Sequence, residues 1–246
     1  MKAVRFFTKL GIGAIVIMGF NLCSCKKYSY DYQPGNLEVK VTEGEHWKHD
    51  FPLFLGIKIK NTPQMAIWVE DLDGNYIATV FATKKIATEG WMANGGNRRK
   101  EALPHWCYKR GVQYSDGLYL PTKDQPLVDA ITGATPDKSF QVKTTPKGNL
   151  RQFVLKFEVN HSTDFNSAYP KGASVGDSNY SGGEMGGGQP ALVYAALVDL
   201  DSMTKEYKLT LVGHSSPDGS SGELYPDLSD LTTALSIVKE VAVVIH

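Results

Sequence analysis

The alternation of apolar and polar residues predicts a chain built mainly of β-strands. Side chains point to opposite faces along a strand, so a strand with one buried face repeats with period two. Such alternation, or a continuous apolar run, covers residues 37–41, 54–60, 65–70, 76–81, 152–159, 191–200, 207–212 and 234–245. The last run suits a strand that is buried on both faces or that closes a sheet. No internal repeat and no long amphipathic helix accompanies these seven or eight strands.

The strongest local signal is a hairpin around an Asp-Gly turn. Residues 65–70 and 76–81 are rich in strand-forming residues, and Asp71-Leu72-Asp73-Gly74-Asn75 separates them. The same five residues begin like a calcium-binding loop, but the twelfth position is Ala82, where such loops need glutamate. A turn therefore explains this segment better than a metal site does.

Strands joined by irregular segments predict one immunoglobulin-like antiparallel β-sandwich over residues 37–246. A parallel α/β fold is disfavoured because its crossover helices are missing and only one short helix, near residues 100–108, is expected. Two long connections stand out. Residues 89–111 contain the basic run Arg98-Arg99-Lys100, which we expect to form a solvated face, and the glycine-rich residues 172–190 are either mobile or functional.

Residues 1–24 have the pattern of a leader and not of a fold. A basic start precedes an apolar run over residues 10–20 that is too short to span a bilayer. The following Leu22-Cys23-Ser24-Cys25 resembles the lipobox of bacterial lipoproteins. That resemblance implies that Cys25 is acylated and becomes the first residue of the mature chain, with residues 25–36 as lipidated cysteine and tether. A plain secretory leader would leave the position of Cys25 unexplained.

Removal of the leader changes the charge and the expected partners. The chain has 26 basic and 26 acidic residues, and without the three basic residues of the leader 23 basic remain, for a net charge of −3. A nucleic-acid binder needs a basic face, so no nucleic-acid partner is expected. Two or three acyl chains would anchor the protein permanently in a membrane. Lys26 stands where resembling inner-membrane lipoproteins have aspartate, which implies the outer membrane, facing the periplasm.

Other candidate chemistry is weaker. Cys107 has no disulfide partner and is expected to be a small buried residue. His46 and His49 are three residues apart, but no third metal ligand is identified, so a solvated loop is the preferred interpretation and no metal is expected. His214-Ser215-Ser216 lacks the Gly-x-Ser-x-Gly elbow of hydrolases, and a turn at residues 215–222 explains it better. A hydrolase therefore ranks far behind the other functions.

The main functional signal is the run Asp129-Ala130-Ile131-Thr132-Gly133-Ala134-Thr135. It matches Asp-(Gly/Ala)-x-(Ser/Thr)-Gly-Ala-(Ser/Thr), the acceptor pattern of proteins modified by extracytosolic flavin transferases. A random chain of this length would match on the order of once in several thousand. The resemblance implies that a transferase splits FAD and attaches FMN to the Thr135 hydroxyl as a phosphoester.

Attachment of FMN by a transferase would explain why the motif contains small residues. Gly133 and Ala134 would let the backbone enter the transferase cleft, and Asp129 would hold the loop through hydrogen bonds to the backbone. The competing interpretation is a helix N-cap, because Thr135 precedes Pro136, and proline favours the first helical position. Flavin-attachment domains usually continue with small and hydroxyl residues, where this chain has Pro136-Asp137-Lys138.

The wider chain resembles a family of predicted periplasmic proteins, number 2271 among the domains of unknown function. Apart from the flavin motif, the segments that carry the resemblance are Ile67-Trp68-Val69-Glu70-Asp71, Asp73-Gly74, Phe157-Glu158-Val159-Asn160 and Asp164-Phe165-Asn166. It covers residues 57–244. Members tend to occur beside flavin transferases and membrane-bound reductase-type proteins, which raises the flavin interpretation by association.

Two functions from different classes follow. The first is a lipid-anchored electron carrier outside the cytoplasm, flavinylated at Thr135 and reduced by a membrane-bound reductase-type protein. The second is a non-catalytic binding or adaptor β-sandwich without a cofactor, which would use the loops at residues 172–190 and 89–111 to hold a partner. Neither is an independent enzyme.

Overall fold

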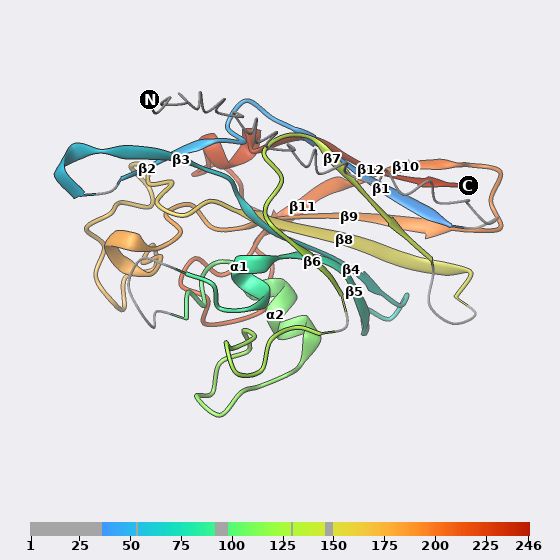
Figure 1. Ribbon diagram of the computed structural model, residues 1–246, viewed down its shortest axis with the longest axis horizontal. Helices are drawn as coiled ribbons and strands as arrows, with labels where there is room; N and C mark the ends of the chain where they lie inside the picture. Colours follow the sequence, from blue (N-terminus) through green and yellow to red (C-terminus); the bar gives the residue numbers. More distant parts are fainter. Residues whose placement is uncertain (1–35, 53, 92–97, 129, 146–149) are drawn as a thin grey trace, which may run out of the picture. The chain divides into compact units, whose positions relative to one another are not determined.

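The computed structural model describes residues 36–52, 54–91, 98–128, 130–145 and 150–246 (Figure 1). The predicted leader, Cys25 and Asp129 lie outside these residues. The strands are β1 (Leu37–Glu43), β2 (His49–Pro52), β3 (Lys58–Asn61), β4 (Gln64–Glu70), β5 (Tyr76–Thr83), β6 (Ile131–Gly133), β7 (Phe140–Thr144), β8 (Gln152–Asn160), β9 (Leu192–Asp199), β10 (Glu206–Lys208), β11 (Thr210–His214) and β12 (Val238–Ile245). The helices are α1 (Lys84–Ala87), α2 (Pro104–Arg110) and the 3-10 turns η1 (Phe54–Gly56), η2 (Gly183–Met185) and η3 (Thr233–Ser236).

Two sheets form the body of the fold. One has the strand order β10-β12-β1-β7, and the other has the order β11-β9-β8-β4-β5-β6. Strands β2 and β3 pair separately as a two-stranded ribbon. Every pair is antiparallel except β5 with β6, which is parallel. The predicted mainly β antiparallel sandwich with long irregular loops is confirmed.

The first core lies between the four-stranded and six-stranded sheets. Alternate residues of β8 face it, and Phe153, Leu155 and Phe157 are essentially inaccessible to solvent. Val39 of β1 and Val243 of β12 approach from the opposite sheet. Burying a large apolar side chain contributes about 1.5–3 kcal/mol, so this alternation fixes which face of each strand points inward.

The second core covers the other face of the six-stranded sheet. Trp68 of β4 points away from the first core because its neighbours, Met65 and Ile67, point into it. Trp106 of α2 and Ile86 of α1 pack over this face, where both side chains are fully buried. The two short helices therefore form a partial third layer (Figure 1). None of the helices in the described part of the chain is long and apolar enough to cross a membrane.

The predicted hairpin is present. Strands β4 and β5 pair antiparallel, and the Asp71 carboxylate accepts hydrogen bonds from the backbone N–H groups of Asp73 at 3.0 Å and Asn75 at 2.8 Å. Gly74 has a φ of 81°, a value that glycine adopts without strain. The Asp71 carboxylate thus closes its own turn, as proposed for this segment in preference to a calcium loop.

Several strand boundaries differ from the predictions. Residues 207–212 form two strands, β10 and β11, which join different sheets, because Leu209 between them turns into the first core. Residues 54–60 include η1, where Leu55 has a φ of 55°, so only their end is strand β3. Strands β6 and β7 have three and five residues, too short for a clear period-two signal.

The long connections are more deeply packed than their composition suggests. The solvated face predicted for Arg98-Arg99-Lys100 is wrong for Arg99, which is 3% exposed, stacks on Trp91 and pairs with Glu101 at 3.5 Å. Residues 186–190 are buried as well. A Cβ on Gly188 would lie 2.4 Å from the carbonyl carbon of Asp164, so close packing of two backbone segments requires this glycine.

Candidate functional site

Residues 131–133 of the flavin motif form β6, which joins β5 in the one parallel pair among the described strands. The register pairs Ala82 with Thr132 and Thr83 with Gly133. Parallel strands end on the same side of a sheet, so the residues that follow Thr83 and Gly133 emerge together. These are the lysines of α1 on one strand and Ala134 with Thr135 on the other.

Thr135 itself is half-buried, and no helix starts there. Residues 134–139 form an irregular segment with a bend, so the N-cap interpretation of Thr135 and Pro136 is wrong. The Thr135 side chain forms no hydrogen bond with any residue that the structure describes. The next residue is held in place, because the Trp47 indole N–H donates to the Pro136 carbonyl at 3.1 Å. The threonine hydroxyl is therefore available on a fixed segment of backbone.

The small residues of the motif are not required by the fold. Gly133 lies outside the left-handed region, and a Cβ on it would meet only a ring carbon of Phe81 at 3.9 Å, an ordinary contact. Ala134 and Thr132 are exposed. Of the motif residues named as a cofactor site, Thr132, Gly133, Ala134 and Thr135 therefore lie together on the sheet edge, whereas Asp129 lies outside the described residues.

A groove of about 430 Å³ opens beside Thr135, within the usual range for small-molecule sites. Its lining residues come from three segments and are Thr62, Lys84, Lys85, Thr88, Gly90, Ala134 and Thr135. We call it the lysine groove. No carboxylate lines it. Its lysines could not be recognised from the sequence, because they lie about fifty residues before the motif.

The two lysines differ in their surroundings. Lys84 is exposed, whereas Lys85 is half-buried and its Nζ donates to Asn61 Oδ1 at 3.2 Å. Burial and, secondly, the nearby Arg99 charge lower the pKa of Lys85 below its ordinary value. Among the described residues neither lysine forms an ion pair with a carboxylate. The groove is thus a concave surface with positive charge that no carboxylate of the described residues pairs with.

A second groove, of about 420 Å³, is lined in part by Asp137 and Lys138 of the 134–139 segment. Its lining residues are Glu43, Gly44, Glu45, Trp47, Lys48, Asp137 and Lys138. We call it the mixed-charge groove, because three carboxylates stand among its two lysines. The two grooves have similar size and opposite electrostatic character.

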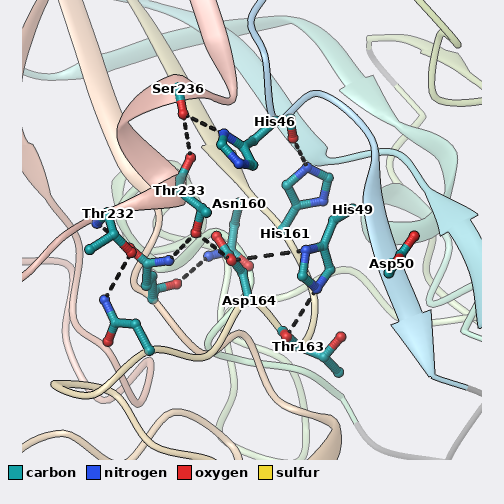
Figure 2. Close-up of polar contacts among 12 residues, drawn as sticks. His46, His49, Asp50, Asn160, His161, Thr163, Asp164, Thr232, Thr233 and Ser236 are labelled. Atoms are coloured by element: carbon teal, nitrogen blue, oxygen red, sulfur yellow. Dashed lines mark hydrogen bonds and ion pairs between the residues drawn. The ribbon is translucent and has the colours of Figure 1, made fainter.

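The richest polar cluster lies elsewhere, where β2 approaches the end of β8 (Figure 2). The His49 ring packs 5.5 Å from the His161 ring, measured between centroids, and its Nδ1 lies 3.9 Å from a carboxylate oxygen of Asp164. We call this group the histidine cluster. His161 and Asp164 have no sequence proximity to His49, so only the fold reveals them as its neighbours.

Most polar groups of the histidine cluster are hydrogen-bonded, although the buried His161 Nδ1 and Thr163 Oγ1 have no hydrogen-bond partner among the described residues. His161 donates to the His46 carbonyl at 2.9 Å, and His49 donates to the Thr163 carbonyl at 3.1 Å. The Thr233 hydroxyl donates to Asp164 at 2.6 Å. Burial lowers the pKa of His161 to about 4, so this ring is neutral near pH 7.

The histidine cluster corrects one prediction without supplying a metal site. His46 and His49 are partly buried and hydrogen-bonded, so the solvated-loop interpretation is wrong. In the described chain, no group of three or more His, Cys, Asp or Glu side chains is arranged to hold a metal ion. We therefore interpret this cluster as a polar connection between β2, the end of β8 and η3.

The remaining reactive residues serve the fold. Ser215 is buried, and its hydroxyl donates to the Ala191 carbonyl at 3.3 Å. The Ser216 hydroxyl donates to Asp218 at 2.6 Å inside the predicted turn. Cys107 is fully buried as expected, which raises the pKa of its thiol and leaves it unreactive.

Two buried carboxyl groups have partners in α2 and in the sheet. Glu158 accepts hydrogen bonds from the backbone N–H groups of His105 at 3.2 Å and Trp106 at 2.7 Å, and burial raises its pKa to about 8. Glu70, 2% exposed, accepts from the Trp68 indole at 2.8 Å and pairs with Lys156 at 3.1 Å. Both carboxylates already have partners, so we interpret them as structural.

No family model, no curated protein and no solved structure matches the chain. The resemblance to family 2271 and to flavin-transferase substrates stays a prediction from the quoted motifs. We therefore choose the candidate functional site by geometry. The lysine groove beside Thr135 is favoured, because its polar groups have fewer partners among the described residues than those of the histidine cluster.

Proposed function

We propose that the protein is a lipid-anchored electron carrier outside the cytoplasm, with FMN attached to Thr135 through a phosphoester. The observation that carries the proposal is the Thr135 hydroxyl, which is hydrogen-bonded to no described residue at the edge of the lysine groove. The acceptor motif supplies the identity of the group, and the leader pattern supplies the anchor at Cys25 in the outer membrane, facing the periplasm.

The attachment is a balanced phosphoryl transfer. The Thr135 oxygen forms a bond to the phosphorus of the FMN half of FAD, the pyrophosphate bond breaks, and AMP leaves. The hydroxyl proton passes to the catalyst or solvent. The flavin transferase must approach the backbone closely, which agrees with the exposed Ala134 and with a glycine at 133 that packing does not demand.

The residues of the site fit such a group. The lysine groove is large enough for part of a flavin nucleotide and offers amino and hydroxyl groups without a carboxylate. When bound, a flavin supplies one- and two-electron transfer, and the protein's part is to position it. A membrane-bound reductase-type protein is the proposed electron source, because members of the resembling family tend to occur beside such proteins.

Mass spectrometry tests the proposal directly. The full chain is expressed with its own leader, with and without an extracytosolic flavin transferase, and purified in detergent. We expect a mass gain of one FMN less one water, with visible flavin absorbance, only when the transferase is present.

Variants locate the modification. Thr135→Ala should abolish the mass gain, whereas Thr135→Ser keeps a hydroxyl and should retain it. Thr204→Val is the matched control, because it removes a hydroxyl from an exposed residue outside both the motif and the lysine groove. An unmodified, colourless wild-type protein beside an active transferase would reject the carrier and leave the cofactor-free binding or adaptor protein.

A further inference from the structure

The lysine groove carries two amino groups that no carboxylate of the described chain neutralises. We propose that Lys84 and Lys85 bind the phosphate group of flavin mononucleotide, both before and after its attachment to Thr135. The identity of the nucleotide rests on the proposed function. The preference for a phosphate rests on the groove alone.

The register of the parallel pair fixes the position of the lysines. Thr83 pairs with Gly133, so Lys84 and Lys85 leave the sheet at the same end as Thr135. The amino groups and the acceptor hydroxyl therefore line one groove instead of opposite faces of the sheet.

The local charge favours an anion. Lys85 is half-buried beside another cation, Arg99, and its own hydrogen bond goes to the neutral Asn61 amide. This environment disfavours its positive charge, and a bound phosphate would supply the missing counter-charge. Charge-assisted hydrogen bonds between an ammonium group and a phosphate are among the stronger polar contacts.

The donor set is completed by a hydroxyl. The Thr62 side chain lines the groove and forms no hydrogen bond with the described residues. The Thr88 hydroxyl instead donates to the Lys84 carbonyl at 2.8 Å, which fixes the backbone of α1. One rigid turn thus presents both lysines, with a free hydroxyl facing the same space.

The mixed-charge groove gives an internal comparison. It has similar volume and also two lysines, Lys48 and Lys138, but Glu43, Glu45 and Asp137 line it as well. Phosphate would meet repulsion from these carboxylates. Charge therefore selects the lysine groove.

Binding of free flavins to the unmodified protein tests the site. The full chain, expressed without a flavin transferase and purified in non-ionic detergent, is titrated against FMN and against riboflavin, which lacks the phosphate. Flavin fluorescence anisotropy reports binding, with detergent alone as the blank. We expect FMN to bind about tenfold more tightly than riboflavin, the difference that one charge-assisted hydrogen bond produces. Inorganic phosphate should displace FMN.

Substitutions assign the effect to the two lysines. The double variant K84Q/K85Q should bind FMN no better than riboflavin, and the exposed K84Q alone should show part of the loss. The control K48Q/K138Q, in the mixed-charge groove, should bind like the wild type. Near-ultraviolet circular dichroism verifies that each variant is folded. Equal affinity for FMN and riboflavin, or unchanged FMN binding in K84Q/K85Q, would overturn the site.

The same variants separate this inference from the proposed function. If Thr135 is never modified but free FMN binds through the lysines, the anion site stands and the covalent carrier fails. If Thr135 is modified, the flavin anisotropy should fall in K84Q/K85Q, because the attached group would no longer be held. A modified protein with unchanged anisotropy and no preference for FMN would reject the anion site alone.

Discussion

The histidine cluster and the lysine groove hold polar residues under opposite conditions. Asp164 receives a hydrogen bond from Thr233, and the rings of His49 and His161 donate to backbone carbonyls. In the lysine groove, Lys84 has no carboxylate partner in the described chain, and Thr135 has no hydrogen bond there. The histidine cluster has more reactive side chains than the lysine groove, but the hydrogen bonds of these side chains are made within the cluster.

This contrast shows why the number of reactive residues is a poor guide to a site. Burying a polar group without a partner is costly, and most groups of the histidine cluster have partners that link β2, β8 and η3, with His161 Nδ1 and Thr163 Oγ1 as the exceptions among the described residues. An exposed polar group can form its hydrogen bonds with water and needs no partner in the protein. Residues whose type and arrangement are not demanded by the fold are therefore the better candidates for recognition.

A pair of lysine substitutions should give the largest difference in the free energy of unfolding between a residue that supports the fold and a residue that binds a ligand. Lys156→Met leaves the buried Glu70 carboxylate without its closest cation, at an expected cost of about 3–5 kcal/mol in the free energy of unfolding. Lys84→Met should change it by less than about 0.5 kcal/mol. Urea unfolding of both variants measures this, and equal costs would break the comparison.

A pair of glycines provides the next test. Gly188 has a φ of 77° and no room for a Cβ against Asp164, so Gly188→Ala should cost about 2–4 kcal/mol. Gly133→Ala should leave stability within about 0.5 kcal/mol but prevent flavin transfer. Urea unfolding and intact mass are read on the same samples. A destabilised Gly133→Ala would mean that the fold requires this glycine after all.

The buried Glu158 should make stability depend on pH above neutrality. Its folded-state pKa of about 8 lies above the ordinary 4.5, so the native state keeps a proton that the unfolded chain loses. The stabilisation is full below pH 4.5 and is lost as the pH rises through about 8. From pH 6.5 to 8 the wild type should lose up to about 2 kcal/mol. Glu158→Gln should flatten this slope in urea unfolding, and a parallel slope would contradict the assignment.

His161 should make the folding stability fall as the pH is lowered in the acidic range, which is the opposite direction to the effect of Glu158. Its pKa falls from 6.5 to about 4 on folding, so its stabilisation is present above pH 6.5 and is lost as the pH falls through about 4. Between pH 6.5 and 4.5 the wild type should lose about 2 kcal/mol more than His161→Gln. Glutamine can still donate to the His46 carbonyl. Equal losses would show that folding does not lower the pKa of His161.

Local pattern predicted much of the fold. The period-two runs located β1, β4, β5, β8, β9 and β12, and Asp71 with Gly74 predicted the hairpin turn. These signals depend on neighbours in the chain. The pattern failed at β6, with three residues, and at Arg99, whose burial depends on Trp91 and Glu101 around it.

The sequence by itself determined the acceptor motif, the lipobox-like leader and the mainly β class, because each is written in consecutive residues. Only the tertiary structure decided that Lys84 and Lys85 stand beside Thr135, and that His161 and Asp164 join His49. The physical reason is strand pairing. Hydrogen bonds between β5 and β6 bring together segments about fifty residues apart, and no local pattern records that register.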